Sequence, residues 1–76
     1  MKNYVVGISS LYDNDIKLFK VSAKNEYEAV KKGMVDFTSE EYKQSEIDWQ
    51  NSEDYPNDLD GLYSAYEEMP FSVLEV

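Results

Sequence analysis

Carboxylates are the most numerous side chains in this 76-residue chain that could bind a charged partner. The chain holds 16 Asp and Glu, seven Lys and no Arg. Ten of these carboxylates lie within SEEYKQSEIDWQNSEDYPNDLDGLYSAYEE (39–68), which contains a single lysine, Lys43, and has tyrosine and tryptophan between the acids. Such a surface suits the lysines and arginines of a basic partner, because aromatic rings attract cations and carboxylates form charge-assisted hydrogen bonds with them.

The same composition argues against an enzyme and against a bound cofactor. The chain has no histidine and no cysteine, so the commonest general base and the thiol nucleophile are both missing. A pair of carboxylates could act as acid and base, but a domain of this size has little volume for a shielding cleft. The three glycines are isolated and form no phosphate-binding loop. We therefore expect no catalysis and no cofactor.

A calcium site is an alternative for the segment PNDLDGLYSAYE (56–67). With Gly61 at the glycine position of an EF-hand loop, Asp58, Asp60 and Glu67 take ligand positions. Pro56 would then stand first in the loop, where it offers no side-chain oxygen. Capping of a helix explains the aspartates without a metal, so no metal ligand is predicted.

The charge is distributed unequally along the chain. Residues 1–34 carry six lysines and four acids, a sum of +2, whereas residues 35–76 carry Lys43 and twelve acids, a sum of −11. This asymmetry predicts one acidic face. Direct binding to DNA, RNA or an anionic membrane is disfavoured, because phosphates are bound by clustered lysine and arginine. The alternative is that the acidity serves mainly solubility.

Composition also indicates a single folded domain over residues 1–76. Apolar residues make up 42% of the chain and aromatic residues 14%, too many for an obligately disordered segment. The absence of cysteine excludes a disulfide scaffold and favours a cytoplasmic location. The first apolar run is too short for a signal sequence or a membrane span.

The first third of the chain predicts a β-hairpin. Residues 3–10 are rich in β-branched side chains, residues 12–15 (YDND) are typical of a turn, and residues 16–23 form a second strand. The alternation in this second strand slips, since Ile16 and Leu18 have one parity and Phe19 and Val21 the other. Either both faces of the strand are covered or a bulge shifts its register.

Two segments have helical signals. Asn25 is expected to cap a helix whose apolar face repeats at helical spacing to Phe37, with Gly33 weakening it by about 1 kcal/mol. A second helix is predicted over 57–69, capped by Asn57 and stopped by Pro70. Between them, residues 38–55 lack a clear period and fit a helix, a strand or a loop. Residues 71–76 read as a closing strand.

The predicted fold class is therefore α+β. A small antiparallel sheet, made of the hairpin and the C-terminal strand, carries one or two helices on one face, in the order β-β-α-(α)-β. Tyr63 and Tyr66 are expected in the core, on the apolar face of the second helix. Trp49, Tyr42 and Tyr55 lie in segments of weak periodicity and are expected to be more exposed.

The predicted partner-binding surface consists of the ten carboxylates of residues 39–68, which we name the acidic belt, together with Trp49. These residues are Glu40, Glu41, Glu46, Asp48, Trp49, Glu53, Asp54, Asp58, Asp60, Glu67 and Glu68. The second predicted helix is about 20 Å long and carries four of the acids, whereas one DNA strand of that length carries roughly six phosphates. The charge density is thus near that of one nucleic-acid strand.

In type, the chain resembles the small acidic phage-encoded inhibitors that act as DNA mimics, among them anti-restriction and anti-CRISPR proteins and inhibitors of histone-like proteins or RNA polymerase. The likeness lies in the short chain, the absence of Cys and His, a pI near 4.2, and acids with aromatics along helices and loops. The segment FKVSAKNEYEAVKKG (19–33) also looks like a strand-then-helix unit frequent in small phage reading frames. The resemblance implies a viral inhibitor that occupies the nucleic-acid-binding surface of a basic host protein in the bacterial cytoplasm. The alternative is an interaction module without mimicry, and pairing of edge strands could make a homodimer.

Overall fold

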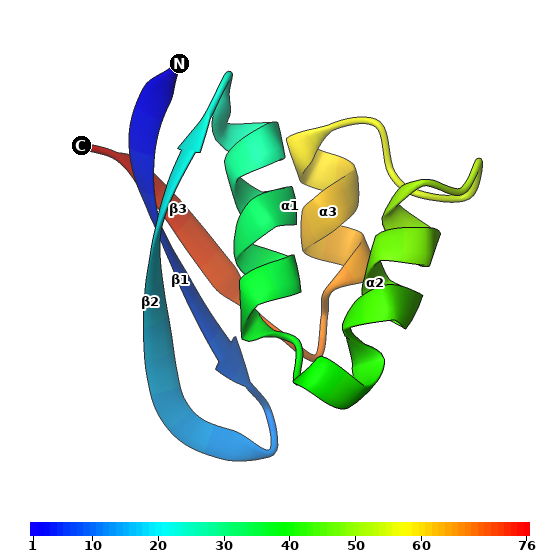
Figure 1. Ribbon diagram of the computed structural model, residues 1–76. Helices are drawn as coiled ribbons and strands as arrows, with labels where there is room; N and C mark the ends of the chain where they lie inside the picture. The colour runs from blue at the N-terminus through cyan, green and yellow to red at the C-terminus, as the bar shows by residue number, and fades with distance from the viewer.

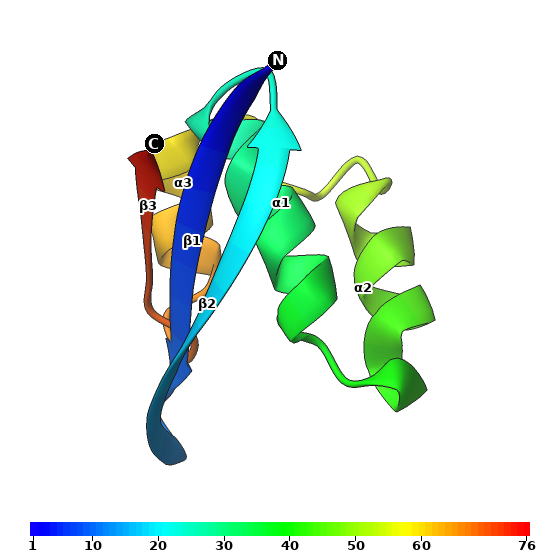
Figure 2. The same ribbon diagram turned by 60° about the vertical axis from the view of Figure 1, so that its left-hand side comes forward.

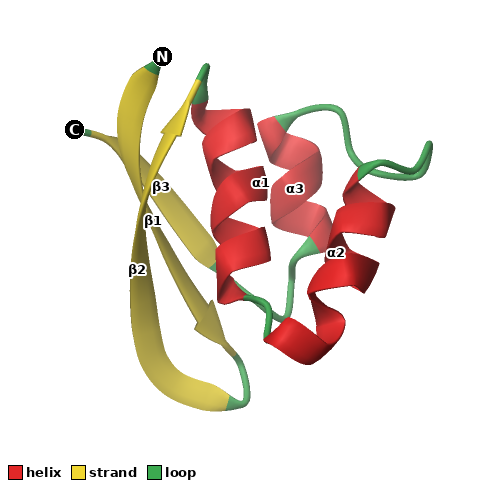
Figure 3. Ribbon diagram, viewed as in Figure 1, coloured by secondary structure: helices red, strands yellow, loops and turns green.

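The computed structural model describes residues 1–76, except for the side chains of residues 13 and 14. Figure 1 shows a sheet on one side and helices on the other. The elements are, in chain order, β1 (Lys2–Ser10), β2 (Asp13–Ala23), α1 (Glu26–Phe37), the 3-10 turn η1 (Glu40–Tyr42), α2 (Lys43–Gln50), α3 (Leu59–Ala65) and β3 (Phe71–Glu75). The α+β class and the sheet of a hairpin plus a C-terminal strand are confirmed, while the helices number three instead of one or two (Figure 3).

The sheet has the order β2-β1-β3, and both pairings are antiparallel. Its central strand, β1, alternates strictly, so Tyr4, Val6 and Ile8 are buried on the side that faces the helices. The hairpin turns at Leu11 and Tyr12, with Ser10 opposite Asp13. The turn therefore lies earlier in the chain than the predicted residues 12–15. The side chains of Asp13 and Asn14, residue types that form hydrogen bonds to the backbone in turns, lie outside the described residues.

The alternation of β2 is regular from Ile16 to Ala23, and the register shift lies before Ile16, next to the turn. Ser9 pairs with Ile16 and Ser10 with Asp13, so the extra residues lie before Ile16, and the pairing from Ile16 to Ala23 is regular. Ile16 and Leu18 consequently point to the outer face of the sheet and remain 70% and 71% exposed. Neither of the two predicted explanations is therefore right: the register shift does not fall between Leu18 and Phe19, and the apolar side chains of Ile16 and Leu18 lie uncovered on the outer face.

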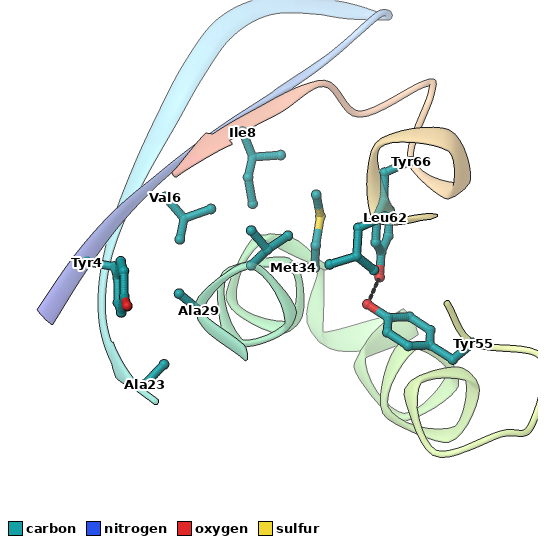
Figure 4. Close-up of a cluster of buried hydrophobic side chains, with 10 residues drawn as sticks. Tyr4, Val6, Ile8, Ala23, Ala29, Met34, Tyr55, Leu62 and Tyr66 are labelled. Carbon is teal, nitrogen blue, oxygen red and sulfur yellow. Dashed lines mark hydrogen bonds between the residues drawn. The ribbon is translucent and has the colours of Figure 1, made fainter. Parts of the chain in front are cut away.

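Helix α1 lies directly against the inner face of the sheet, and α2 and α3 pack against α1 (Figure 2). The side chain of Asn25 caps α1 by accepting a hydrogen bond from the Glu28 N–H at 2.9 Å, as predicted. The helix ends at Phe37, where the Thr38 N–H and hydroxyl both donate to the Met34 carbonyl. Side chains from the sheet, from α1 and from the α2–α3 region meet in the core (Figure 4).

Gly33 marks the closest approach of α1 to the sheet. A Cβ placed there would lie 2.9 Å from Val6 Cγ1 and 3.0 Å from Val6 Cβ. Glycine has a low helix propensity, which is the basis of the prediction that it weakens this helix. It also lets the backbone of α1 lie close to Val6 of β1, where the methyl group of an alanine would not fit.

Residues 38–55 are mainly helical in the structure. The turn η1 leads straight into α2, and an irregular loop follows to Asp58. The alternating Ile47 and Trp49 thus lie on a helix and not on a strand. Helix α3 is shorter than the predicted 57–69, and its N-cap is Asp58 and not Asn57, because the Asp58 carboxylate accepts from the Gly61 N–H at 2.8 Å. Over the described residues, none of the helices has the length and apolar character needed to cross a membrane.

Candidate functional site

The acidic belt is carried entirely by elements on the helical side of the sheet. Glu40 and Glu41 lie in η1, Glu46 and Asp48 in α2, Glu53 and Asp54 in the following loop, Asp58 and Asp60 at the start of α3, and Glu67 and Glu68 between α3 and β3. Nine of the ten are exposed and Glu46 is half-buried. The α2–α3 loop and η1 lie at opposite ends of α2 (Figure 1), so the belt surrounds the helical layer and does not form one straight row.

No lysine neutralises the belt. Among the described residues the ion pairs are Lys2 with Glu75, at 3.7 Å, and Lys31 with Glu28, at 3.9 Å, and neither contains a belt carboxylate. Exposed pairs of this kind contribute little to stability in any case. Over the described residues the belt charge is therefore not paired with lysine, and the mutual repulsion of its carboxylates opposes folding.

Lys43, the one lysine within the belt segment, is used to close α1. Its ammonium group donates to the carbonyls of Val35 at 2.9 Å and Thr38 at 2.8 Å. These carbonyls lie at the C-terminal end of α1, where backbone acceptors lack helical partners and a cation is favourable. The position of Lys43 thus follows from helix capping and not from balancing the neighbouring acids.

Two belt carboxylates have structural contacts that the sequence did not reveal. Glu46 accepts hydrogen bonds from the Tyr66 hydroxyl at 2.6 Å and from Gln50 Nε2 at 2.9 Å. Asp58 caps α3, as described above. The remaining eight belt acids are exposed, and among the described side chains the one hydrogen bond to any of them is from Gln44 to Asp48, at 2.9 Å. These eight are the carboxylates free to meet a partner.

The aromatic residues of the segment are more buried than the sequence suggested. Tyr55 is only 6% exposed, and Trp49 is half-buried with its ring centroid 4.9 Å from that of Tyr55 and 5.3 Å from that of Tyr66. The prediction that Trp49 and Tyr55 are exposed is therefore wrong, because Trp49 of α2 and Tyr55 of the following loop both pack against Tyr66 at the end of α3. Tyr66 is buried as predicted, whereas Tyr63 is 48% exposed and stacks on Phe71 at the edge of the core.

A chain of hydrogen bonds joins this aromatic cluster to the belt. Tyr66 has one hydroxyl proton, which it donates to Glu46, so Tyr55 must donate its own to the Tyr66 oxygen, 2.9 Å away (Figure 4). Burial raises the pKa of Tyr55 to about 12, with the Glu46 charge acting in the same direction. Burial and the bond to Glu46 raise the pKa of Tyr66 still further. Glu46 is thus an anchor for α2 against α3.

An open hollow of about 340 Å³ lies between α2, the end of α1 and the α3–β3 connection. We name it the aromatic hollow; its lining includes Phe37, Tyr42, Ser45, Glu46, Trp49 and Met69. Tyr42 is 60% exposed, as predicted, and lies beside Glu40 and Glu41 in η1. Met69 directly follows Glu67 and Glu68 in the chain. An apolar hollow with acids around it suits a lysine or arginine side chain, whose aliphatic stem is apolar and whose head is charged.

The structure thus brings Glu46 and Trp49 together at the aromatic hollow and leaves Glu53, Asp54 and Asp60 elsewhere on the helical layer. Sequence reasoning missed Phe37 and Met69, which come from distant segments and carry no local signal of such a role.

The EF-hand-like alignment finds no matching geometry in the described part of the chain. There, no group of three or more histidine, cysteine, aspartate or glutamate side chains is arranged to hold a metal ion.

Comparison with protein-family models, with curated proteins and with solved structures gives no match to this chain.

Proposed function

We propose that this chain is a non-enzymatic inhibitor whose acidic belt occupies the nucleic-acid-binding surface of a basic host protein. The observation that carries the proposal is the state of the belt: nine exposed carboxylates, and no ion pair to any of them among the described residues. An ordinary surface intersperses both signs of charge. A surface whose charges are of one sign and unpaired favours a partner of the opposite charge. The charges speed the encounter by electrostatic steering, and they match the potential of the partner's surface.

The charge density supports mimicry of one nucleic-acid strand. The longest dimension of the molecule is 31 Å. Over that length one DNA strand carries roughly nine phosphates and a duplex roughly eighteen. The nine exposed belt carboxylates match the single strand in number but are spread around the helical layer and not along one line. The belt therefore offers a protein that binds one backbone a similar amount of charge, without the regular spacing of the phosphates.

The aromatic hollow would supply the contacts that charge alone does not. A lysine or arginine of the partner can lay its stem against Trp49 and Tyr42 and direct its charged end to Glu40 or Glu41. Rigid aromatic residues in a pocket are the usual anchors of protein interfaces, and carboxylates around them supply charge-assisted hydrogen bonds. The inhibitor would act by occlusion, holding the groove so that nucleic acid cannot enter.

The resemblance in type to phage-encoded DNA mimics adds the setting. Such an inhibitor would work in the cytoplasm of a bacterial host and would need no cofactor. The chain itself would not bind nucleic acid, because its lysines are few and several are used internally: Lys43 caps α1 and the Lys32 ammonium donates to the Ser22 carbonyl.

The test is capture from bacterial lysate with three baits of known charge. The first is the unchanged protein. The second carries Asp48→Asn, Glu53→Gln, Asp54→Asn and Asp60→Asn, which neutralise four free belt acids and leave the cap at Asp58 intact.

The third bait is the matched control, with Glu26→Gln, Glu28→Gln, Asp36→Asn and Glu75→Gln. It has the same net charge as the second bait, since four of the carboxylates are removed in each, but its belt is intact. The lysate is applied at about 0.1 M and about 0.5 M salt, over which the screening length falls from roughly 10 Å to less than half that.

Mimicry predicts that a nucleic-acid-binding protein is retained at low salt by the first and third baits, is lost from the second, and is eluted by duplex or single-stranded DNA. A partner held equally by the second bait, or not displaced by DNA, refutes mimicry. If that partner is instead lost on Trp49→Ala or Tyr42→Ala, the chain is an interaction module without mimicry, and its acidity serves solubility.

A further inference from the structure

The outer face of the sheet carries several exposed apolar side chains among polar ones such as Asn3, Lys20 and Ser72, and it has no helix over it. Figure 2, in which the strands lie in front of the helices, shows this face open. The register places Val5 and Gly7 of β1 side by side with Leu18 of β2 and Leu74 of β3. Ile16, Leu18 and Leu74 are each about 70% exposed, with Leu74 at 68%. Side chains of this kind usually face the core of an antiparallel sheet, while the open face is polar.

This face has both a ridge and a hollow. Gly7 has no side chain, and around it lies a hollow of about 150 Å³ whose walls include Val5, Ile16, Leu18 and Leu74. A Cβ on Gly7 would lie 3.2 Å from Leu18 Cδ2, which shows how closely Leu18 stands beside the hollow. In a two-fold symmetric contact the same patch must fit itself, so it needs a projection and a recess together. The outer face has both.

The charge distribution favours a second copy over a charged partner on this face. Among the paired positions of the outer face the only charged residue is Lys20, opposite Val5, and its long stem allows the ammonium group to stay in water at the rim. Two copies carry −9 each and repel one another wherever their belts approach. Contact through the outer faces places the belts on opposite sides of the pair. Stacked sheets and helices add about 10 Å per layer, so the belt acids of η1, α2 and α3 in one copy lie more than a screening length of about 8 Å from those in the other. Glu68 is the exception, because its carbonyl accepts from the Leu11 N–H beside the outer face.

We infer that the outer face of the sheet, formed by Val5, Gly7, Ile16, Leu18, Ser72 and Leu74, is the contact of a weak, two-fold symmetric homodimer. The inference is independent of what the acidic belt binds. It also differs from pairing of edge strands, which the sequence allowed, because two sheets that pack face to face make contact through side chains and not through backbone hydrogen bonds.

The area of the face sets the strength of the dimer. Three strands about 4.8 Å apart and seven residues rising about 3.3 Å each give a flat area of roughly 300 Å². Leu11 and Tyr12 of the exposed hairpin turn extend this area at one end. A stable interface buries about 800 Å² per partner, and smaller ones belong to transient complexes. We therefore expect a dissociation constant between about 10 µM and about 1 mM, which corresponds to free energies at the weak end of protein association.

The experiment is sedimentation equilibrium of the purified chain from about 10 µM to about 2 mM in about 0.15 M salt, a range that brackets the expected constant. The weight-average mass should rise from that of a monomer toward that of a dimer. Leu18→Glu should weaken association at least tenfold, because it replaces the ridge with a charge that meets its own copy. Leu74→Ser tests the same face without adding charge and should weaken association several-fold.

The matched control is Tyr42→Glu. It replaces an exposed apolar side chain with a charge on the helical side, so it should leave the association constant unchanged. Circular dichroism and thermal unfolding check that each variant is folded, as expected from the exposure of the substituted side chains.

A chain that stays monomeric at about 2 mM overturns the inference. So does a dimer that is unaffected by both Leu18→Glu and Leu74→Ser, or one that Tyr42→Glu disrupts. Because the measurement uses the isolated chain, a negative result leaves the proposed function untouched, and failure of the lysate test leaves this inference untouched.

Discussion

Replacement of Gly33 by alanine should destabilise the protein, although alanine is the better helix former. In an exposed helix the change would stabilise by about 1 kcal/mol. Gly33, however, is buried where α1 crosses β1. An added Cβ would lie 2.9, 3.0 and 3.3 Å from the three side-chain carbons of Val6, whereas carbon atoms in contact are ordinarily about 3.5–4.0 Å apart.

Val6 has no easy way to give room. Rotation of its side chain does not move its Cβ, and its backbone is paired on both sides, with Phe19 in β2 and Val73 in β3. The helix must therefore move outward by roughly half an ångström or more, judged from the ordinary contact distance. Overpacking of this kind costs about 1–3 kcal/mol. Because the added Cβ would lie well inside the ordinary contact distance and Val6 cannot move away, a cost of about 2–3 kcal/mol is expected. After the gain of about 1 kcal/mol in helix propensity, the expected net loss is about 1–2 kcal/mol.

The assay is urea unfolding followed by circular dichroism, with thermal unfolding beside it. A loss of about 1–2 kcal/mol corresponds to a fall of roughly 5–15 °C in the unfolding midpoint of a domain this small. Val6→Ala removes two of the three crowding carbons, so Gly33→Ala should be less harmful, by about 1 kcal/mol or more, in that background. If Gly33→Ala stabilises the protein in both backgrounds, α1 does not approach β1 as described and the reasoning fails.

Three further predictions follow from the polar contacts. Tyr66→Phe should reduce the free energy of unfolding by about 1.5–3 kcal/mol, because the Glu46 carboxylate loses a buried hydroxyl donor. Urea unfolding measures this loss. A loss below about 0.5 kcal/mol would contradict the hydrogen bond between Tyr66 and Glu46. The stabilisation that comes from the protons of Tyr55 and Tyr66 should be complete below the ordinary tyrosine pKa near 10. It should be lost as the pH rises from about 10 to about 12 and beyond, because the folded state raises both pKa values and therefore holds protons that the unfolded chain has lost. A pH series of unfolding curves shows this fall, which Tyr55→Phe should reduce. Lys43→Met should cost about 1–2 kcal/mol through loss of the charged donor at the end of α1, whereas Lys24→Met, at an exposed lysine, should change stability by less than about 0.5 kcal/mol.

Local sequence signals were sufficient to predict the helices and strands whose ends or faces are set by residues close by in the chain. Asn25 caps α1 because its side chain reaches the N–H three residues on, a contact within one turn of chain. The alternation of β1 selected its buried face for the same reason, since successive strand residues point to opposite sides. The hairpin and the closing strand also depend on short runs of sequence.

Helix α2 could not be predicted because its stabilising contacts come from elsewhere in the chain. Its own residues show little amphipathic order, and it is stabilised by contacts with other segments: Trp49 packs on Tyr55 and Tyr66, and Glu46 accepts the Tyr66 hydroxyl. These partners lie up to 20 residues away. The N-cap of α3 moved by one residue because Asp58 and Asn57 are equally good caps locally, and only the path of the loop selects between them.

The sequence by itself determined the sign and the amount of charge, the absence of histidine and cysteine, and the α+β order, because these depend on composition and on periodicity within single elements. Only the tertiary structure decided which charged groups are free. It directed Lys43 to the end of α1, Glu46 to Tyr66 and Asp58 to the start of α3, and it left the other eight acids of the belt facing water. It also turned Ile16 and Leu18 away from the core. The physical reason is that hydrogen bonding and burial are properties of positions in space, and in this chain the groups that meet come from different elements.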